Sequence, residues 1–584
     1  MSKPDKYEIL AELARRRGLF WPSFEIYGGV SGFIDYGPLG TSLRRKIENK
    51  WRRLFISGES LLEIDTPIIV PERVFLTSGH VDHFKDPIVQ CLQCKRAFRA
   101  DHLLKETTGA AAEGLSISQM IEEIANKMVR CPECGGSLSD PEEMSTMFRT
   151  AIGPAGDATA YGRPETAQGM FVDFKRLHEI SRDRLPIGIA QIGRVLRNEI
   201  SPRQGPIRLR EFNMMEFEFF FDPQDPRCTR YDEIKDVELN LVPLARREKG
   251  LEESITVTVG EAVDQGYLVS QWLAYFMVLS KRFVSDLGIP ENCQRFHEKL
   301  ATERAHYSQQ TYDLEVLLDR WGWVELAGHA YRGDFDLSAH MKVSGVDLRA
   351  FKPYDKPRTT SMRRVKPNLA LIGKEYKEQA PQIAKLVTGL NPDEFEASIK
   401  SNGYVEVGGY RLRSEHASVV SEQIEETGHR FLPHVVEPSF GTDRLLYATV
   451  EYAYTVKEDR VVLQLPRDLV PVDIVVLPLM AKDGLREKAN KIYFTLREER
   501  LDAEYDEAGS IGRRYARADE VGIPLGVTVD YGTLKDDTVT IRERDSWNQV
   551  RANSSELPSL VWEFLRGKKE FKDLGTPLTQ EPRT

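Results

Sequence analysis

Hydrophobic positions along the chain change period several times, and these changes predict where helices and strands lie. Over residues 41–55 the apolar side chains recur at helical spacing, which predicts an amphipathic helix. A strand follows over 61–69, and Pro67 interrupts it. Because proline cannot donate to a sheet ladder, this strand belongs at a sheet edge or an interface. The pair predicts either a subunit contact or an ordinary helix–strand unit.

Two segments with alternating side chains, 187–200 and 208–221, predict a hairpin with a turn-rich loop at 201–206. Side chains alternate across a strand, so Phe217 and Phe219 share an apolar face that would pack on a core. Arg208, Phe212 and Glu216 share the opposite face. That face would gather a guanidinium, an aromatic ring and a carboxylate. A salt-bridged amphipathic hairpin would explain the same pattern.

The remaining pattern is helical in the middle of the chain and alternates between strand and helix at its end. Residues 224–325 are predicted to be mostly helical, and 435–440 to be a strand that enters an apolar helix. Beyond 471, predicted strands at 472–477, 503–505 and 525–530 alternate with helices at 485–501 and 510–521. This order is typical of a small α/β domain. The polar tail after Gly567 is predicted to be flexible.

Length and composition indicate an ordinary globular protein of several domains. With 584 residues, 41% hydrophobic and 29% charged, the chain is long enough for roughly three or four domains. It has no run of about 18 apolar residues and no apolar leader, so we expect a cytoplasmic protein with no membrane partner.

The charge balance argues against a nucleic-acid binder by charge alone, since the net charge is -10. One local exception lies between Lys352 and Lys385, where nine Lys/Arg face three acids. This basic segment is either a solvated surface or an RNA-facing one.

Four of the six cysteines form two pairs, Cys91-x-x-Cys94 and Cys131-x-x-Cys134. Such knuckles suit tetrahedral ligation of a structural zinc ion by four thiolates. The 36 residues between them exceed the usual spacing, so a helix over 117–129 is expected to bridge them. The alternative is a set of reduced thiols in a degenerate site. Closed coordination by four cysteines leaves no open position for a catalytic metal.

Two arginines in short motifs point to ATP handling. Arg197 stands in Arg197-Asn198-Glu199 beside the hairpin, and Arg444 stands in Gly441-Thr442-Asp443-Arg444. A cation in the first turn of a helix opposes the helix dipole, so an anionic partner is expected at Arg444. Guanidinium groups bind phosphate bidentately, and a triphosphate would serve.

Together with the Pro67 helix–strand pair, these motifs resemble the three motifs of class II aminoacyl-tRNA synthetases. Further segments resemble the glycyl-tRNA synthetase family of the homodimeric archaeal and eukaryotic kind. They are the glycine- and aromatic-rich stretch 24–40 and the motifs at 98–102, 163–169, 210–212 and 437–441. The resemblance spans nearly the whole chain. It implies an α+β fold: an antiparallel-sheet catalytic core with helices, a C-terminal α/β anticodon-binding domain and a cysteine-knuckle insertion.

The resemblance also implies a division of the chain. The catalytic core would comprise 1–84 with the dimerisation motif, 161–224 with the second motif, and 431–466 with the third. Insertions would lie at 85–160, with the zinc knuckles, and at 225–430. The second insertion would contact the tRNA acceptor stem and include a core ATP segment at 321–340. The anticodon-binding domain would occupy 467–566, and a flexible tail 567–584.

For ATP, the resemblance implies catalytic roles for Arg197 and Arg444. Arg197 would hold the α-phosphate, while Arg208 and Arg444 would bind the outer phosphates together with Mg²⁺. Phe212 and Arg444 would sandwich the adenine. The other implied ATP-binding residues are Asn198, Glu199, Leu209, Glu325, Leu326 and Gly441, with Glu199 on the adenine amino group and Glu325 as a ligand of Mg²⁺.

For glycine, the resemblance implies a small pocket that reads an ammonium group. Glu165, Glu216 and Glu437 would supply acceptors and Ser439 a hydroxyl. Arg99 and Arg332 would approach the substrate carboxylate. Overpacking costs about 1–3 kcal/mol in a filled site, so three carboxylates around a small cavity disfavour even an added methyl group.

The implied activity is formation of glycyl-adenylate from glycine and ATP, followed by transfer of glycine to tRNA(Gly) by a homodimer. Two alternatives remain at this point. One is a class II synthetase for another small amino acid such as serine, proline or threonine, against which the three-carboxylate pocket argues. The other is a non-catalytic RNA-binding accessory protein with the same fold, which would be free to lose Arg197, Glu199 or Arg444.

Overall fold

A nine-stranded, mostly antiparallel sheet forms the centre of the fold in this computed structural model, which describes residues 5–109, 115–202 and 204–578. The strand order is β13-β12-β14-β15-β16-β21-β11-β10-β3, and only the β12–β14 and β10–β3 pairs among these are parallel. The strands are β3 Leu62–Glu63, β10 Ile187–Leu196, β11 Glu211–Phe221, β12 Glu238–Val242, β13 Ile255–Thr258, β14 Gln294–Glu298, β15 Gln310–Leu318, β16 Gly322–Gly333 and β21 His434–Gly441.

The predicted hairpin is the pair β10–β11, and its two faces meet different helices. Phe217 and Phe219 pack on Phe276 of α10 (Gln271–Asp286), each with ring centroids 4.9 Å apart. Phe220 packs on Phe174 of α7 (Ala167–Ile180), with ring centroids 4.5 Å apart. Successive side chains on a strand point to opposite faces, so the even-numbered residues of β11, Glu216 among them, share the α7 side.

Pro67 divides the predicted strand 61–69 in two. The part before it, β3, pairs with β10 in the central sheet. The part after it, β4 (Ile69–Pro71), pairs with β9 (Ala158–Gly162) in a separate three-stranded sheet completed by β8 (Phe148–Ile152). The helix before them, α2 (Pro38–Trp51), continues as a π-helix over Arg52–Ser57. The missing N–H of proline explains why one ladder cannot run through this segment.

The prediction of a mostly helical stretch at 224–325 is wrong, because β12 to β15 and the start of β16 lie within it. Its longest helix is α10, beside the shorter α8 (Leu244–Arg247) and α9 (Val259–Asp264). Along β15 the buried positions recur at every second residue, as on a strand packed on one face: Gln310, Tyr312, Leu314, Val316 and Leu318. The central sheet therefore includes strands up to residue 333. The segment inserted into the catalytic core is accordingly shorter than the predicted 225–430.

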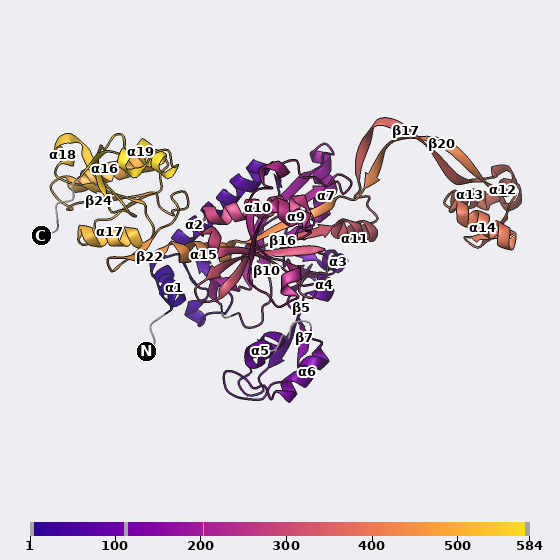
Figure 1. Ribbon diagram of the computed structural model, residues 1–584, viewed down its shortest axis with the longest axis horizontal. Helices are drawn as coiled ribbons and strands as arrows, with labels where there is room; N and C mark the ends of the chain where they lie inside the picture. The colour runs from indigo at the N-terminus through magenta and orange to yellow at the C-terminus, as the bar shows by residue number, and fades with distance from the viewer. Residues whose placement is uncertain (1–4, 110–114, 203, 579–584) are drawn as a thin grey trace. The chain divides into compact units, whose positions relative to one another are not determined.

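Residues 349–432 form a compact unit of their own. A long two-stranded ribbon of β17 (Ala350–Pro367) and β20 (Ala417–Phe431) carries a small helical cluster at its end (Figure 1). The cluster contains α12 Leu369–Tyr376, α13 Ala380–Thr388, α14 Pro392–Asn402, β18 Tyr404–Val407 and β19 Tyr410–Arg413.

The cysteine insertion has its own small sheet and core. Its strands are β5 (Lys85–Gln90), β6 (Ala97–Arg99) and β7 (Glu142–Ser145), and its helices are α5 (Ala100–Thr108) and α6 (Ile117–Asn126). Val89, Leu103, Leu104 and Met120 are buried together beneath them. The helix expected to bridge the two knuckles is therefore present as α6.

The C-terminal part is the predicted α/β domain, built on a six-stranded sheet of order β25-β24-β26-β27-β28-β29. Its elements are β24 Ile474–Pro478, α16 Leu485–Glu498, β25 Ala503–Tyr505, α17 Ile511–Glu520, β26 Leu525–Val529, α18 Thr533–Asp536, β27 Thr538–Glu543, β28 Gln549–Asn553, α19 Leu557–Leu565 and β29 Thr576–Pro577. The predicted flexible tail is corrected in its first part: Phe571 and Leu574 are buried, and β29 pairs with β28. Residues 579–584 of that tail lie outside the described residues.

The shorter elements around the central sheet position the site described next. They are α1 Lys6–Arg17, β1 Phe20–Pro22, β2 Ile34–Tyr36, α3 Glu72–Thr77, α4 His80–His83, α11 Phe335–Ser344, α15 Thr442–Ala453, β22 Tyr454–Lys457 and β23 Arg460–Leu463. Among the described helices, none combines the length and the apolar character that crossing a bilayer requires.

Candidate active site

A cavity of about 310 Å³ lies over β11, β16 and β21 and brings most of the predicted substrate residues together. That volume is at the small end of the range for small-molecule sites. The predicted residues that line it are Glu165, Arg197, Glu199, Arg208, Leu209, Phe212, Glu216, Glu325, Leu326, Glu437, Ser439, Gly441 and Arg444.

Arg197 follows the end of β10 and is held at the cavity wall. Its Nε donates to the Pro164 carbonyl at 3.0 Å. Its guanidinium carbon lies 5.4 Å from the ring centroid of Phe212 and 5.6 Å from that of Phe84. One backbone carbonyl and two aromatic rings therefore fix the orientation of this cation.

Arg444 enters the cavity from the first turn of α15, directly after β21. Asp443 fixes this turn: it accepts the backbone N–H of Asn213 on β11 at 2.6 Å and the hydroxyl of Tyr36. The Nη1 of Arg444 donates to the Glu325 carbonyl at 2.7 Å and lies 3.3 Å from Glu325 Oε2. The anionic partner expected at this helix start is thus Glu325.

Two cavity residues beside Glu325, Lys299 and Asp313, were not among the predicted ones. Lys299 Nζ lies 2.8 Å from Asp313 Oδ2. Burial alone would raise the pKa of Glu325, but Lys299 and Arg444 lower it to about 2. Burial and the Glu325 carboxylate raise the pKa of Asp313 to about 8. The alternation along β15 could have revealed Asp313, had its period been recognised.

Glu216 is held by three donors at the other end of the cavity. Both the backbone N–H and the hydroxyl of Thr166 donate to it at 2.5 Å, and the Ser439 hydroxyl donates at 2.7 Å. The last contact follows from the sheet, because Glu216 on β11 lies opposite Ser439 on β21. Thr166 was not predicted, although it stands beside Glu165 in one of the matching motifs.

Arg332 lies behind the cavity rather than in its lining, with 1% of its surface exposed. Its Nη1 is 2.7 Å from Glu437 Oε2 and its Nε is 2.8 Å from Asp336 Oδ2. Burial raises the pKa of Glu437 to about 8 against the lowering effect of Arg332, and the Glu165 and Glu216 carboxylates add to the rise. In this structure Arg332 pairs with protein carboxylates.

Glu165 completes the acidic end of the cavity. Its Oε1 lies 3.2 Å from Nε2 of the fully buried His80 and 3.8 Å from Arg332 Nη2. Burial would raise the pKa of Glu165, but His80 and Arg332 hold it well below its ordinary value. His80 was not predicted, because a single histidine on a short helix carries no motif.

Besides Arg332, two predicted residues lie outside the cavity lining. Arg99, on β6 of the cysteine insertion, pairs with Asp101 at 2.7 Å and with Asp86 at 3.2 Å. Asn198 donates its backbone N–H to the Thr146 carbonyl at 2.7 Å.

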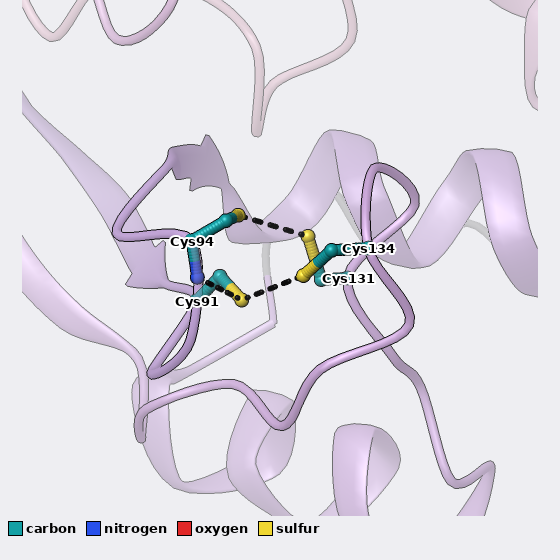
Figure 2. A group of neighbouring side chains, drawn as sticks. All are labelled: Cys91, Cys94, Cys131 and Cys134. Atoms are coloured by element: carbon teal, nitrogen blue, oxygen red, sulfur yellow. Dashed lines mark hydrogen bonds between the residues drawn. The ribbon is translucent and has the colours of Figure 1, made fainter.

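The four knuckle cysteines converge as predicted. Their sulfur atoms all lie within 4.8 Å of one another. Figure 2 shows the two loops facing each other, with Cys91 Sγ 3.5 Å from Cys134 Sγ and Cys94 Sγ 3.7 Å from Cys131 Sγ. These separations are much longer than a disulfide bond of about 2.05 Å, so the group is a set of four free thiols around one point.

The cavity therefore combines two groups of charged side chains. In the first, Arg197, Arg208, Lys299 and Arg444 lie among the acids Glu199, Asp313 and Glu325, and the second consists of Glu165, Glu216 and Glu437. A phosphate chain suits the first group and a small ammonium the second.

Comparison with known proteins agrees with this chemistry. Residues 473–563 match the anticodon binding domain family. An antiparallel core with this arginine hairpin, joined to such a domain, defines a class II aminoacyl-tRNA synthetase. The chain is 49% identical to the glycine–tRNA ligase of Aeropyrum pernix, over 98% of this chain and 99% of that protein.

Two further relatives carry the same name. The glycine–tRNA ligase of Pyrococcus horikoshii is 48% identical, over 97% of this chain and 100% of its own length. That of Thermococcus kodakarensis is 46% identical, over 96% of this chain and 99% of its own length. The chain belongs to the glycine–tRNA ligase family. Neither alternative drawn from the sequence, another small-amino-acid synthetase or a non-catalytic relative, is favoured by these likenesses.

Proposed function

We propose that this chain activates glycine with ATP and transfers the glycyl group to the 3′ end of tRNA(Gly). The observation that carries the proposal is one cavity whose lining contains both three arginines and a group of three glutamates. The arginines suit a triphosphate and the glutamates an ammonium group, and their presence in one cavity suits attack of a carboxylate on a phosphate.

In the first step, a glycine carboxylate oxygen bonds to the α-phosphorus of ATP while the bond to pyrophosphate breaks. Arg197 neutralises charge on the α-phosphate, and Arg208 and Arg444 hold the outer phosphates. Phe212 stacks on the adenine opposite Arg444, and Glu199 accepts from its amino group. The remaining ATP contacts come from Asn198, Leu209, Leu326 and Gly441. The protein supplies positioning and charge rather than a nucleophile.

Glu325 is the proposed ligand of Mg²⁺, which would neutralise phosphate charge when bound. The residue suits this role because it lines the cavity and its depressed pKa keeps it ionised. Carboxylate oxygens are the ligands that Mg²⁺ prefers in protein sites.

Glycine binds beside the acidic group of the cavity. Its ammonium group donates hydrogen bonds to the carboxylates of Glu165, Glu216 and Glu437. Ser439 and Thr166 keep the Glu216 carboxylate in place. Arg197 faces the same cavity and is the better candidate for the substrate carboxylate than Arg99, which is paired with Asp101. Arg332 orients Glu437 from behind instead of meeting the substrate.

The cysteine group suits structural zinc. A tetrahedral site with Zn–S bonds of about 2.3 Å has sulfur atoms about 3.8 Å apart. The separations of 3.5 and 3.7 Å between facing cysteines are close to that value. Zinc would hold the two knuckle loops together and leave no position for substrate.

The proposal includes binding of tRNA by residues 349–432 and by the anticodon-binding domain. Lys356, Arg358 and Lys366 of the ribbon are exposed, whereas Arg363 and Arg364 are paired with acids of the same unit. It also includes a homodimer, supported by the exposed apolar residues on either side of a groove between α3 and α7. We place the reaction in the cytoplasm, where charged tRNA is used.

Amino-acid-dependent exchange of pyrophosphate into ATP tests the activity. We expect glycine to support exchange at least about 100-fold better than alanine or serine. Exchange with alanine or serine but not glycine would overturn the substrate, and no exchange with any amino acid would overturn the activity. In a charging assay, Lys356→Ala with Lys366→Ala should raise the KM for tRNA while exchange, which needs no tRNA, stays normal.

A further inference from the structure

Glu218 lies inside β11 without a hydrogen-bond partner among the described residues. Its side chain is fully buried, and neither carboxyl oxygen has a donor within reach. Burying an unpaired carboxylate is far more costly than burying a neutral acid. A glutamate is compatible with this position only if its carboxyl group keeps its proton, or if a carboxylate charge here has a function in the site.

The sheet register places Glu218 directly behind the cavity. Glu216 is opposite Ser439 and Phe219 is opposite Val436, so Glu218 lies opposite Glu437. Cβ atoms of opposed residues in an antiparallel pair are about 4.5–5.5 Å apart, which brings two glutamate side chains on one face within hydrogen-bonding reach. Glu437 lines the cavity and Glu218 does not.

The charges around Glu218 leave it short of a cation. Facing it are the carboxylates of Glu437 on β21, Glu216 on β11 and Asp336 on α11, and one cation, Arg332 on β16. Arg332 already bonds to Asp336 and Glu437. Burial and the Glu437 carboxylate raise the pKa of Glu218 well above its ordinary value. Burial also raises the pKa of Glu437, to about 8, but the Arg332 guanidinium bonded to it opposes that rise, so Glu218 is the member of this opposed pair that keeps its proton more firmly.

We propose that Glu218 is a positioning residue of the glycine pocket: a neutral carboxylic acid whose O–H donates to the carboxylate of Glu437. Glu437 is then held by Arg332 on one side and by Glu218 on the other. Glu437 is aimed at the cavity, where the positive charge of the substrate ammonium favours its ionised form. The inference rests on the proposed role of Glu437 in binding glycine.

Two substitutions distinguish three roles for the Glu218 side chain: a neutral hydrogen-bond donor, a charged carboxylate, or a group that only fills space. Glu218→Gln keeps the shape and an N–H donor but can never ionise, whereas Glu218→Met keeps the volume and loses the donor. We expect Met to raise the KM for glycine about tenfold, as for one lost hydrogen bond to a charge, with the KM for ATP unchanged. Gln should restore the KM for glycine to within about twofold of the unsubstituted protein.

Two outcomes would overturn the proposal. A rise in the KM for glycine with Gln as large as with Met would mean that Glu218 acts as an anion. An unchanged KM for glycine in both variants would mean that Glu218 only fills space. Glu216→Gln, two residues along the same face, is the control for the proposed pocket. If it leaves the KM for glycine unchanged, the assignment of the pocket fails whatever Glu218 does.

The pH dependence of unfolding gives an independent readout. An acid whose pKa is raised by folding keeps a proton that the unfolded chain releases, so it costs stability as pH rises above about 4.5, the unfolded value, toward the folded one. Gln has no such proton. The Tm of Glu218→Gln, relative to the unsubstituted protein at the same pH, should rise between about pH 5 and 8 and show no such gain near pH 4. A Tm difference that does not change with pH would contradict the neutral acid.

Discussion

At the scale of residues, the site is organised by which charged groups neutralise one another before any substrate arrives. Arg332 donates hydrogen bonds to Asp336 and Glu437, and Arg444 contacts Glu325. Arg197, by contrast, bonds to a backbone carbonyl and lies against rings. Among the described cations that line the cavity, Arg197 is therefore held in place without a carboxylate contact, which suits the role at the α-phosphate.

Arg197→Ala should abolish most pyrophosphate exchange while the protein stays folded. Loss of one fixed group that neutralises charge in a transition state typically costs about 100- to 1000-fold in rate. Arg194→Ala is the matched control, because Arg194 lies three residues before Arg197, near the end of β10, but pairs with Glu211 and does not line the cavity. Exchange assays and thermal melts of both variants would check this. Near-normal exchange by Arg197→Ala would refute the role.

At the scale of elements, the hairpin could be predicted because its two strands alternate clearly and are joined by a turn-rich loop. That alternation fixes which side chains share a face, so Phe212 and Glu216 could be assigned to one surface. The strands at 238–318 were missed because the strong apolar stripe of α10 lies among them and suggested one helical region. Lys299 and Asp313 were missed together with these strands, because the strands place both residues in the cavity.

Pairings made only in three dimensions lie beyond any local pattern. The contact of His80 with Glu165 joins residues 85 positions apart, and nothing near His80 marks it. Arg332 was expected to approach the substrate carboxylate, and a lone arginine in the sequence gives no sign of its partner Asp336 four residues later.

The cysteine knuckles allow a test at the same scale. Purified protein should contain about one zinc per chain, since four thiolates form one closed tetrahedral site. Cys94→Ser should lose the metal and lower the melting temperature, whereas Cys293→Ser, outside the group, should keep both. Metal analysis and thermal melts measure the two effects. Full-length protein with intact thiols and no zinc would contradict the assignment.

At the scale of the whole molecule, the net charge of -10 means that tRNA must bind to local basic surfaces. The ribbon unit is less basic in effect than its composition suggests, because Arg363 pairs with Asp393 and Glu396, and Arg364 with Glu422. The exposed cations of the ribbon outside these pairs include Lys356, Arg358 and Lys366. Binding of tRNA should therefore depend on a limited set of cations and weaken as salt concentration rises.

In the proposed homodimer, a second copy would cover the groove between α3 and α7. It is lined by Val74, Val172, Ile180, Val343 and Val346 among others. Ile180 and Val172 are 64% and 49% exposed, and Ile69 beside Pro67 is 44% exposed. Contiguous apolar surface of this kind marks interaction sites on soluble proteins. It adjoins the strand that the first class II motif assigns to dimerisation.

Ile180→Asp together with Val172→Asp should convert the protein from a dimer to a monomer of 66.6 kDa, because each carboxylate would have to be desolvated in an apolar contact. Sedimentation velocity measures the mass directly. Leu369→Asp is the matched control, since Leu369 is 65% exposed but lies on the separate unit 349–432. It should leave the dimer intact. A monomeric unsubstituted protein, or a dimer unaffected by the double substitution, would place the subunit contact elsewhere.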